Sequence, residues 1–558
     1  MNRTLSQFAF VSTKGPVMSL ACASQSFGIE AIAHGRATIG VCACPGGGSA
    51  TLAQDLQAVA AFRPDAIVTL MSAQELRLLG RADLAEVLPD LTPQWHHIPL
   101  RVGAAPDARF KRLWAYAGHR LREILRRGGR VLLHCDAGGA RARWMAARLL
   151  VELGVPDTEA AARTQAPRLA ATQQVGGGAL VDHPLAGRIL GCLLGGALGD
   201  AFGYPVEFKS WAQIREKFGD AGLTEPQGAG GRLVASDDTQ MALFTADGLL
   251  SAMTPGAPHD AAQLLARIRE AYLAWFRTQR EEWASGPTGL SQYRELWAVR
   301  APGSTCLSAL RAGARGTPEA PINDSKGSGA LARVAPLGLL PAIGADEAFR
   351  LAHAAAALTH GHPAGRLSAA ALASLLRDLL DDRPLTAALG RMESRLDGAG
   401  GGQEVLAAVR AARALAASDT PPRDAIASLG QGWTGDEALA IGLFAVLRAG
   451  SFADALRLAA NHDGDSDTTA AVAGQVWGAL CGVEVLDHGW IRRLDVLEPL
   501  CDVAARLIAR AAAGEDATEP VRAEPLQALR YRPMAARAGG YTPPTSARAE
   551  DPVARQAR

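Results

Sequence analysis

The sequence predicts a multidomain protein in which an N-terminal α/β unit precedes a longer part that contains buried helices. The chain has 558 residues, too many for one ordinary domain. Two short apolar runs, 66–71 and 129–135, are typical of buried strands. Beyond a Gln- and Gly-rich stretch at 170–181, small apolar residues recur at helical spacing. We therefore assign one domain to residues 1–178, a second to 183–512, and a disordered Glu-, Pro- and Arg-rich tail to 513–558.

Composition excludes several classes of protein. The net charge is +1, which argues against general attraction to nucleic acid or to an acidic membrane. Eight cysteines without a C-x-x-C pair suit a reduced cytoplasmic protein. The sequence Lys14-Gly-Pro16 interrupts any signal-peptide core. No stretch is expected to span a membrane, because Arg188 and Asp200 bracket too few apolar residues in the most apolar segment.

The N-terminal unit is predicted to alternate strands and helices. The run 66–71 follows Arg63-Pro64 and predicts a buried strand. Residues 109–127 alternate apolar and basic side chains at helical period. The run 129–135 predicts a second buried strand that leads into the glycine-rich sequence His134-Cys-Asp-Ala-Gly-Gly-Ala-Arg141, and a helix is predicted over 144–153.

This loop has the pattern C-x5-R. A thiolate at Cys135 would lie at a helix N-terminus, where free amides and the helix dipole lower a thiol pKa. The same amides can bind a phosphate, and Arg141 can hold two of its oxygens. The loop, together with Cys42-Ala-Cys-Pro-Gly-Gly47 and His96-His-Ile-Pro-Leu100, resembles the cysteine-dependent dual-specificity phosphatases, most closely the kinase-associated type, over residues 35–175. The resemblance implies that Cys135 and Arg141 are catalytic.

Two departures from the phosphatase pattern put that activity in question. Val102 stands where the family has its general-acid Asp, so Asp107 is the candidate acid. Ala142 replaces the hydroxyl that follows the loop arginine. Loss of a positioned general acid typically costs about 10²–10⁴-fold in rate. Two interpretations stay open: a phosphatase that uses Asp107, and a loop that binds a phosphorylated ligand without hydrolysing it.

Three stretches carry the chemistry of the second part. Residues 461–479 form an acidic turn that leads into a small-residue helix with Gly474 and Gly478 four apart. Residues 236–250 place a hydroxyl and two adjacent carboxylates before an amphipathic helix. Residues 191–207 carry a Gly191/Gly195/Gly199 ladder, typical of a helix that packs closely, and end near Asp200 and Glu207.

The acidic residues predict a hard metal ion. The dipole of the following helix helps to hold Asp465, Asp467 and Thr468 at its N-terminus. Burial of unpaired carboxylates would still cost several kcal/mol each, roughly, so they need a cation. Oxygen-only ligands select Mg²⁺, Mn²⁺ or Ca²⁺ rather than zinc. The alternative is an exposed acidic turn that only caps a helix.

Together these stretches resemble the ADP-ribosylglycohydrolase family, also called the DraG-like or ARH-type hydrolases. Two further motifs agree, Asn323-Asp-Ser-Lys-Gly-Ser-Gly-Ala-Leu-Ala-Arg-Val-Ala-Pro-Leu-Gly338 and Leu358-Thr-His-Gly-His-Pro363, and all five stand in the family's order over residues 185–510. The resemblance implies an all-helical domain with a binuclear Mg²⁺ or Mn²⁺ centre at the mouth of a cleft. Ser236, where many members carry Thr, keeps the hydroxyl, and Asp463 lies outside the ligand pattern.

The resemblance also implies the roles of individual residues. The expected metal ligands are Glu207, Ser236, Asp237, Asp238, Asp465, Asp467 and Thr468. Glu207 and Asp238 are the expected catalytic carboxylates. Ligand binding is expected at Ser325, Lys326, Gly327, Ser328, Gly329 and His360.

The resulting hypothesis is a metal-dependent hydrolase with two Mg²⁺ or Mn²⁺ that removes ADP-ribose from modified side chains, with arginine favoured. Its partner would be an ADP-ribosylated protein or small conjugate, and the N-terminal unit would take a phosphorylated ligand. One alternative is a non-catalytic scaffold that binds ADP-ribose and phosphate. The other is a phosphatase with a regulatory helical domain.

Overall fold

The structure is a computed structural model that describes residues 27–48, 51–92, 94–100, 106–136, 139–166, 183–253, 260–283 and 288–513. The expected linker at 170–181, the expected tail beyond Ala513 and Val102 lie outside these residues. Buried apolar side chains form two large clusters. One consists of residues between 32 and 160, and the other almost entirely of residues between 186 and 511. All seven cysteines in the described part of the chain are free thiols.

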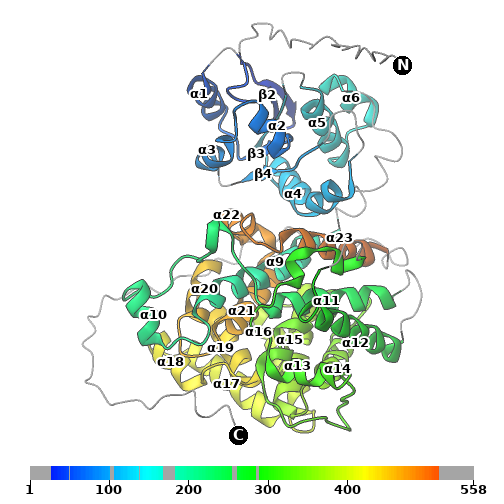
Figure 1. The fold of residues 1–558 in the computed structure, drawn as a ribbon, viewed down its shortest axis with the longest axis vertical. Coiled ribbons are helices and arrows are strands. Elements are labelled where there is room, and N and C mark those ends of the chain that lie inside the picture. The colour runs from blue at the N-terminus through cyan, green and yellow to red at the C-terminus, as the bar shows by residue number, and fades with distance from the viewer. Residues whose placement is uncertain are drawn as a thin grey trace, which may run out of the picture. The chain divides into compact units, whose positions relative to one another are not determined.

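The N-terminal part is built around a five-stranded sheet of order β1-β2-β5-β3-β4. β1 pairs antiparallel with β2, and the other neighbours are parallel. The central strands are buried along nearly their whole length, because helices cover both faces (Figure 1). The elements are β1 Glu30–His34, β2 Ala37–Ala43, α1 Leu52–Phe62, β3 Ala66–Thr69, α2 Ala73–Leu78, α3 Leu84–Leu91, β4 Trp95–His97, α4 Ala108–Arg126, β5 Arg130–Cys135, α5 Ala140–Glu152 and α6 Asp157–Thr164.

The strands predicted at 66–71 and 129–135 are confirmed as β3 and β5, and the helix predicted at 109–127 is confirmed as α4. The predicted start of the next helix was wrong. α5 begins at Ala140 and not at 144, so Arg141 lies in its first turn. Gly139, with φ 65°, adopts the left-handed conformation that allows the chain to leave the loop and enter the helix early.

The second part is a large helical assembly, as predicted. Its α-helices are α9 Ala186–Gly203, α10 Trp211–Phe218, α11 Asp237–Ala252, α12 Ala261–Thr278, α13 Ser304–Arg311, α14 Ala345–Ala357, α15 Pro363–Leu380, α16 Leu385–Asp397, α17 Gln403–Ala416, α18 Pro422–Leu429, α19 Gly435–Arg448, α20 Phe452–Ala460, α21 Ser466–Cys481, α22 His488–Ile491 and α23 Leu497–Ala513. Three short 3₁₀ helices adjoin the site: η1 Tyr204–Val206, η5 Ser328–Ala330 and η6 Ala332–Gly338.

α9 and α21 pack with their backbones almost in contact. A Cβ atom added at Gly195 would lie 2.4 Å from the carbonyl oxygen of Gly474, and one added at Gly478 would lie 1.9 Å from that of Gly191. One turn further on, a Cβ at Gly199 would lie 2.0 Å from the Ala470 oxygen. The predicted glycine ladder therefore serves helix packing. It also brings the end of α9, with Asp200, against the start of α21, where the acidic residues lie.

The expectation about α9 as a membrane segment was only partly right. By length and apolar composition, the segment Ala186–Val206 is able to cross a membrane, although Arg188 and Asp200 were expected to exclude this. Isolated charges within such a segment do not disqualify it. Here most of the segment is buried among other helices of the same chain, as in the core helix of a globular domain.

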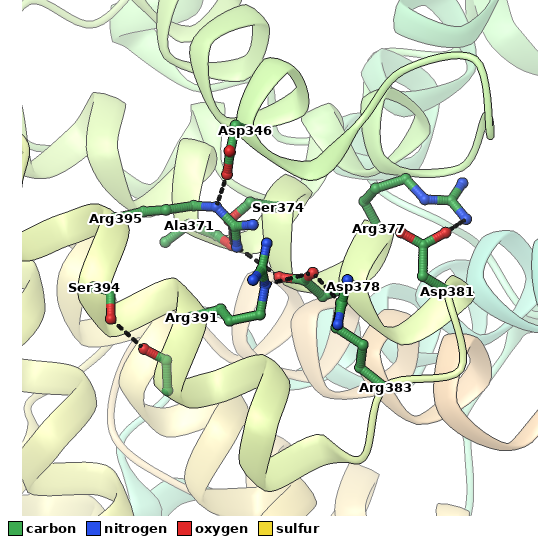
Figure 2. A network of polar contacts seen from close by, with 11 residues as sticks. Asp346, Ala371, Ser374, Arg377, Asp378, Asp381, Arg383, Arg391, Ser394 and Arg395 are labelled. Carbon is green, nitrogen blue, oxygen red and sulfur yellow. Dashed lines mark hydrogen bonds and ion pairs between the residues drawn. The ribbon is translucent and has the colours of Figure 1, made fainter.

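A buried carboxylate joins three helices of the second part (Figure 2). Asp378 on α15 is 1 % exposed, and its oxygens accept hydrogen bonds from Arg391 at 3.1 Å and Arg395 at 2.6 Å, both on α16. Arg383 lies 2.9 Å from the same carboxylate. Arg395 also donates to Asp346 on α14 at 2.7 Å. Because a lone buried carboxylate would be costly, this network stabilises only one arrangement of α14, α15 and α16.

Candidate active site

Three carboxylates converge where η1 meets the N-terminus of α21. Oxygen atoms of Glu207, Asp465 and Asp467 all lie within 4.8 Å of one another. Asp465 and Asp467 are each 4 % exposed. The turn that delivers them is tight: Gly464 has φ 126°, and a Cβ there would lie 2.1 Å from the Gln431 carbonyl oxygen. Asp465 and Asp467 are thus buried although Asp463 is exposed, and the alternative of a wholly exposed acidic cap was wrong.

The N-terminus of α11 supplies a second group, and its two carboxylates face different partners. Ser236 caps the helix by accepting a hydrogen bond from the Asp238 amide at 3.2 Å. Asp237 accepts one from the Gly303 amide at 3.4 Å. Asp238 accepts one from the Thr468 hydroxyl at 2.8 Å. This last contact links α11 to α21, so all seven expected ligands belong to three adjoining segments.

Asp200 holds this arrangement together, a role that sequence reasoning missed. Its carboxylate is fully buried and accepts hydrogen bonds from the Ser236 amide at 2.8 Å and the Thr239 amide at 3.1 Å, as well as from the Thr239 hydroxyl. One side chain on α9 therefore fixes the first turn of α11. The available signal was an acidic residue, Asp200, directly after Gly199 in a segment of small and apolar residues.

Arg300 and Asp495 brace the same turn from outside. Asp495 accepts hydrogen bonds from the Ala235 amide at 3.2 Å and from Arg300 at 2.9 Å. Arg300 donates to the Ala235 carbonyl at 3.0 Å, and its own carbonyl accepts from the Asp237 amide at 3.1 Å. Because Arg300 and Asp495 are far from this turn in the sequence, no local motif predicts their contacts with it.

Burial and mutual repulsion raise the pKa values of these carboxyls. Burial, then the neighbours Asp465 and Asp238, raises the pKa of Glu207 to about 9. Burial and Asp200 raise the pKa of Asp238 to about 8. The pKa of Asp200 rises to about 6, and the pKa values of Asp237 and Asp467 are raised well above the usual range, in each case first through burial. Without a cation, several of these groups keep their protons at neutral pH.

These shifts predict how the metal-free protein responds to pH. A carboxyl whose folded pKa is raised stabilises the fold fully below its unfolded pKa, and this stabilisation is lost as pH rises through the folded value. For Glu207 the loss runs from about pH 4.5 to about pH 9. We expect the melting temperature in chelator to fall between pH 6 and pH 9, and Mg²⁺ to raise it most at pH 9, since ions displace protons. If the melting temperature changed with pH in the same way with and without Mg²⁺, this prediction would be contradicted.

The Gly-rich loop lies against the acidic cluster. The Ser328 hydroxyl donates to an Asp465 carboxylate oxygen, and the Ser328 amide donates to the Trp433 carbonyl at 3.2 Å. Ser325 accepts a hydrogen bond from the Gly327 amide at 3.3 Å. Lys326 instead forms an ion pair with Glu404 on α17, at the protein surface. The expectation for Ser328 concerned ligand binding, so its contact with Asp465 is an addition from the structure.

His360 lies beside this loop as a neutral side chain. Its Nδ1 lies 2.8 Å from the Thr359 hydroxyl, and a Cβ at Gly327 would lie 3.2 Å from its Nε2, or 3.8 Å if placed at Gly329. Burial, with nearby Arg333, lowers the pKa of His360 to about 3. Arg333 is itself fully buried; it donates to the Thr359 hydroxyl at 2.7 Å and lies over the Tyr272 ring.

In the C-x5-R loop of the N-terminal part, the pKa of the Cys135 thiol differs from the expected one. Cys135 ends the central strand β5 as predicted, but its side chain is fully buried, and burial raises its pKa to about 11 even though the Ala142 amide lowers it. The expected low thiol pKa was therefore wrong. Arg141 is buried and donates to the carbonyls of Leu70 at 3.3 Å and Leu100 at 2.9 Å, and it pairs with Glu75 at 2.8 Å. Asp107 is exposed and caps α4, accepting from the Phe110 amide at 2.8 Å.

The residues of the acidic site fit a hard divalent cation. Its donors are carboxylate and hydroxyl oxygens, the ligand type that Mg²⁺ and Mn²⁺ prefer. Three donor atoms lie close enough to share one ion, and their carboxyls are largely buried. Such a cluster is costly unless its charge is compensated.

Comparison with known proteins identifies the family. The model of the ADP-ribosylglycohydrolase family matches residues 182–517. An uncharacterized protein of Archaeoglobus fulgidus is 27 % identical over 322 residues, which cover 57 % of this chain and 94 % of that protein. The ADP-ribosyl-[dinitrogen reductase] glycohydrolase of Rhodospirillum rubrum is 27 % identical over 319 residues, covering 55 % and 90 %.

A shorter match is the ADP-ribosylarginine hydrolase Tri1 of Pseudomonas putida, 37 % identical over 75 residues, which cover 13 % of this chain and 20 % of that protein. Among solved structures, an ADP-ribosylglycohydrolase-related protein complex is 28 % identical with a TM-score of 0.40, covering 58 % of this chain and 98 % of the matched chain. Since the family model spans more than half of the sequence and includes every residue of the acidic site, the chain belongs to the ADP-ribosylglycohydrolase family.

Proposed function

We propose that this protein is a metal-dependent hydrolase that removes ADP-ribose from modified protein side chains, with arginine as the favoured acceptor. The convergence of Glu207, Asp465 and Asp467 in a member of this family is the observation that carries the proposal. The Pseudomonas putida relative is named as an ADP-ribosylarginine hydrolase, and similarity to it favours arginine.

The proposed reaction is hydrolysis of the bond between C1″ of the distal ribose and the acceptor atom. Water supplies a hydroxyl to C1″ and a proton to the departing acceptor. Two Mg²⁺ or Mn²⁺ ions, held by the seven oxygen ligands, would supply positive charge for orienting the ribose hydroxyls and a water molecule. Those ligands are Glu207, Ser236, Asp237, Asp238, Asp465, Asp467 and Thr468.

Glu207 and Asp238 are the residues that we assign to proton transfer and substrate orientation. Glu207 is only half-buried, so a carboxylate oxygen that does not hold an ion can reach a water molecule or the substrate. Asp238 is fixed by the Thr468 hydroxyl, so its remaining oxygen has a defined direction. For the diphosphate and ribose we propose the loop Ser325–Gly329 and His360. In this loop Lys326 would have to leave Glu404 before it could bind a phosphate.

Mass spectrometry of ADP-ribosylated peptides tests the proposal directly. Arginine-linked and serine-linked peptides would be incubated with the protein and Mg²⁺, and a parallel sample would contain chelator. We expect release of ADP-ribose from the arginine-linked peptide, abolished by the chelator and restored by Mg²⁺ or Mn²⁺. Full turnover in chelator would refute metal dependence. Tight ADP-ribose binding without any release would favour the scaffold interpretation.

For the N-terminal part we propose a phosphate-binding site at Cys135 and Arg141. It is supported by the position of Cys135 at the carboxyl end of the central parallel strand β5, directly before α5, where α/β folds commonly bind ligands. The raised pKa of the thiol and the capping role of Asp107 favour binding over hydrolysis. The alternative of a phosphatase regulated by the helical part is therefore the weaker proposal.

Tungstate binding to the full-length protein checks this site. We expect calorimetry to detect one tungstate whose binding is lost in Arg141→Ala and kept in Arg143→Ala, a neighbouring arginine that pairs with Glu30. Hydrolysis of a generic aryl phosphate should be far slower than about 1 s⁻¹. A faster rate would make Asp107 the acid and the protein a two-activity enzyme.

A further inference from the structure

Two aromatic side chains stack on each other at the rim of the acidic site. The rings of Phe208 and Trp433 have centroids 5.2 Å apart and an interplanar angle of 22°. Phe208 is 62 % exposed and Trp433 is 36 % exposed. Exposed aromatic pairs of this size are uncommon without a partner, because their apolar surface stays in water.

The chain conformation at both residues is unusual as well. Phe208 has φ 61°, a left-handed conformation that a bulky residue rarely adopts and that costs about 1–3 kcal/mol. Trp433 follows Gly432, whose φ is 81°. A strained residue that presents its ring to solvent is better explained by a binding role than by stability.

Both rings are tied to the acidic cluster through short covalent and hydrogen-bonded paths. Phe208 directly follows Glu207. The Trp433 carbonyl accepts the Ser328 amide hydrogen bond, and the Ser328 hydroxyl in turn donates to Asp465. A Cβ at Gly432 would lie only 3.4 Å from the Asp465 Cβ. The pair therefore bridges the segment that carries Glu207 and the loop that packs against Asp465.

We infer that Phe208 and Trp433 form an acceptor clamp that binds the guanidinium group of an ADP-ribosylated arginine. This inference rests on the proposed function. The acceptor belongs to a protein, so it must approach from solvent, to which both rings are exposed. A planar cation gains from contact with an aromatic face, whereas a serine acceptor carries no cation.

The clamp is tested with Trp433→Leu and Phe208→Leu, each assayed on the arginine-linked peptide with Mg²⁺. We expect kcat/KM to fall about tenfold, mainly through KM, since a cation–π contact of this kind is worth roughly one power of ten. Affinity for free ADP-ribose, measured by calorimetry, should stay unchanged, and Trp433→Phe should retain most activity. Trp283→Leu is the matched control, because Trp283 is similarly exposed at 41 %.

The possible outcomes separate the clamp from the proposed activity. Equal loss of ADP-ribose affinity in the Leu variants would overturn the clamp and indicate stacking with the adenine base. An unchanged kcat/KM would overturn it too. A wild type active only on serine-linked peptides would leave the hydrolase proposal standing and refute the guanidinium clamp. A wild type inactive on every ADP-ribosyl peptide would refute the proposed function itself.

Discussion

Asp467→Asn is expected to abolish ADP-ribose release and, in chelator, to raise the melting temperature. The Asp467 carboxyl is buried beside Asp465 and Glu207, which raises its pKa well above the usual range. Removing this ionisable group relieves repulsion in the metal-free protein at alkaline pH, where the carboxyls lose their protons, but it deletes a proposed ligand. We expect turnover to fall by about 10²–10³-fold or more, the usual effect of losing one preorganised charged group. The measurements are peptide hydrolysis and melting curves with and without Mg²⁺.

Asp463→Asn is the control for this experiment. Asp463 lies in the same turn, but its carboxylate accepts the Trp211 amide at 2.9 Å, outside the cluster of ligands. Its replacement should preserve both activity and the stabilisation by Mg²⁺. If Asp463→Asn and Asp467→Asn behaved alike, the acidic turn would act as a whole through folding, and the assigned ligand set would be wrong.

Gly195→Ala adds only one methyl group, yet it is expected to lower the free energy of unfolding strongly. The new methyl group would lie 2.4 Å from the Gly474 carbonyl oxygen, which belongs to the rigid backbone of α21. The two helices would have to separate, which moves Glu207 away from Asp465. We expect a loss of about 3 kcal/mol or more in the free energy of unfolding, measured by urea denaturation, since overpacking against backbone cannot relax by a rotamer change.

Gly390→Ala provides the comparison. Gly390 lies within α16, and a Cβ there would meet nothing within 4 Å. The same substitution should therefore stabilise the protein by about 0.5–1 kcal/mol, because alanine is the better helix former. A similar loss at both positions would mean that the close approach of Gly195 to the α21 backbone does not explain its effect.

Much of the acidic site was predictable because its parts are local. The stretches around Asp237 and Asp465 each combine a turn with the first residues of a helix, and Glu207 directly follows η1 at the end of α9; such signals lie within a few residues of sequence. The glycine ladder likewise predicted a helix with a bare face. Spacing alone did not reveal that this face meets α21, because nothing in one helix identifies its partner.

The contributions that sequence reasoning missed depend on long-range contacts. Asp200 reads as the end of an apolar helix, and only the packing of α9 reveals that it caps the turn of α11. Ser328 reads as part of a phosphate loop, yet its hydroxyl reaches Asp465. For Cys135 the local pattern predicted a low pKa, and the tertiary burial of the thiol reversed the sign.

The pairing of α9 with α21 also has a consequence for biosynthesis. α9 ends at Gly203 and α21 begins at Ser466, about 260 residues later, so the contact has a high sequence separation and closes late. A nascent chain on the ribosome exposes the glycine face of α9, without a partner, until the region around Cys481 has been synthesised. During that interval the apolar face of α9 is not covered by its partner helix. Catalytic competence would then appear only once the helical part is nearly complete, which makes activity a sensitive report of full-length synthesis.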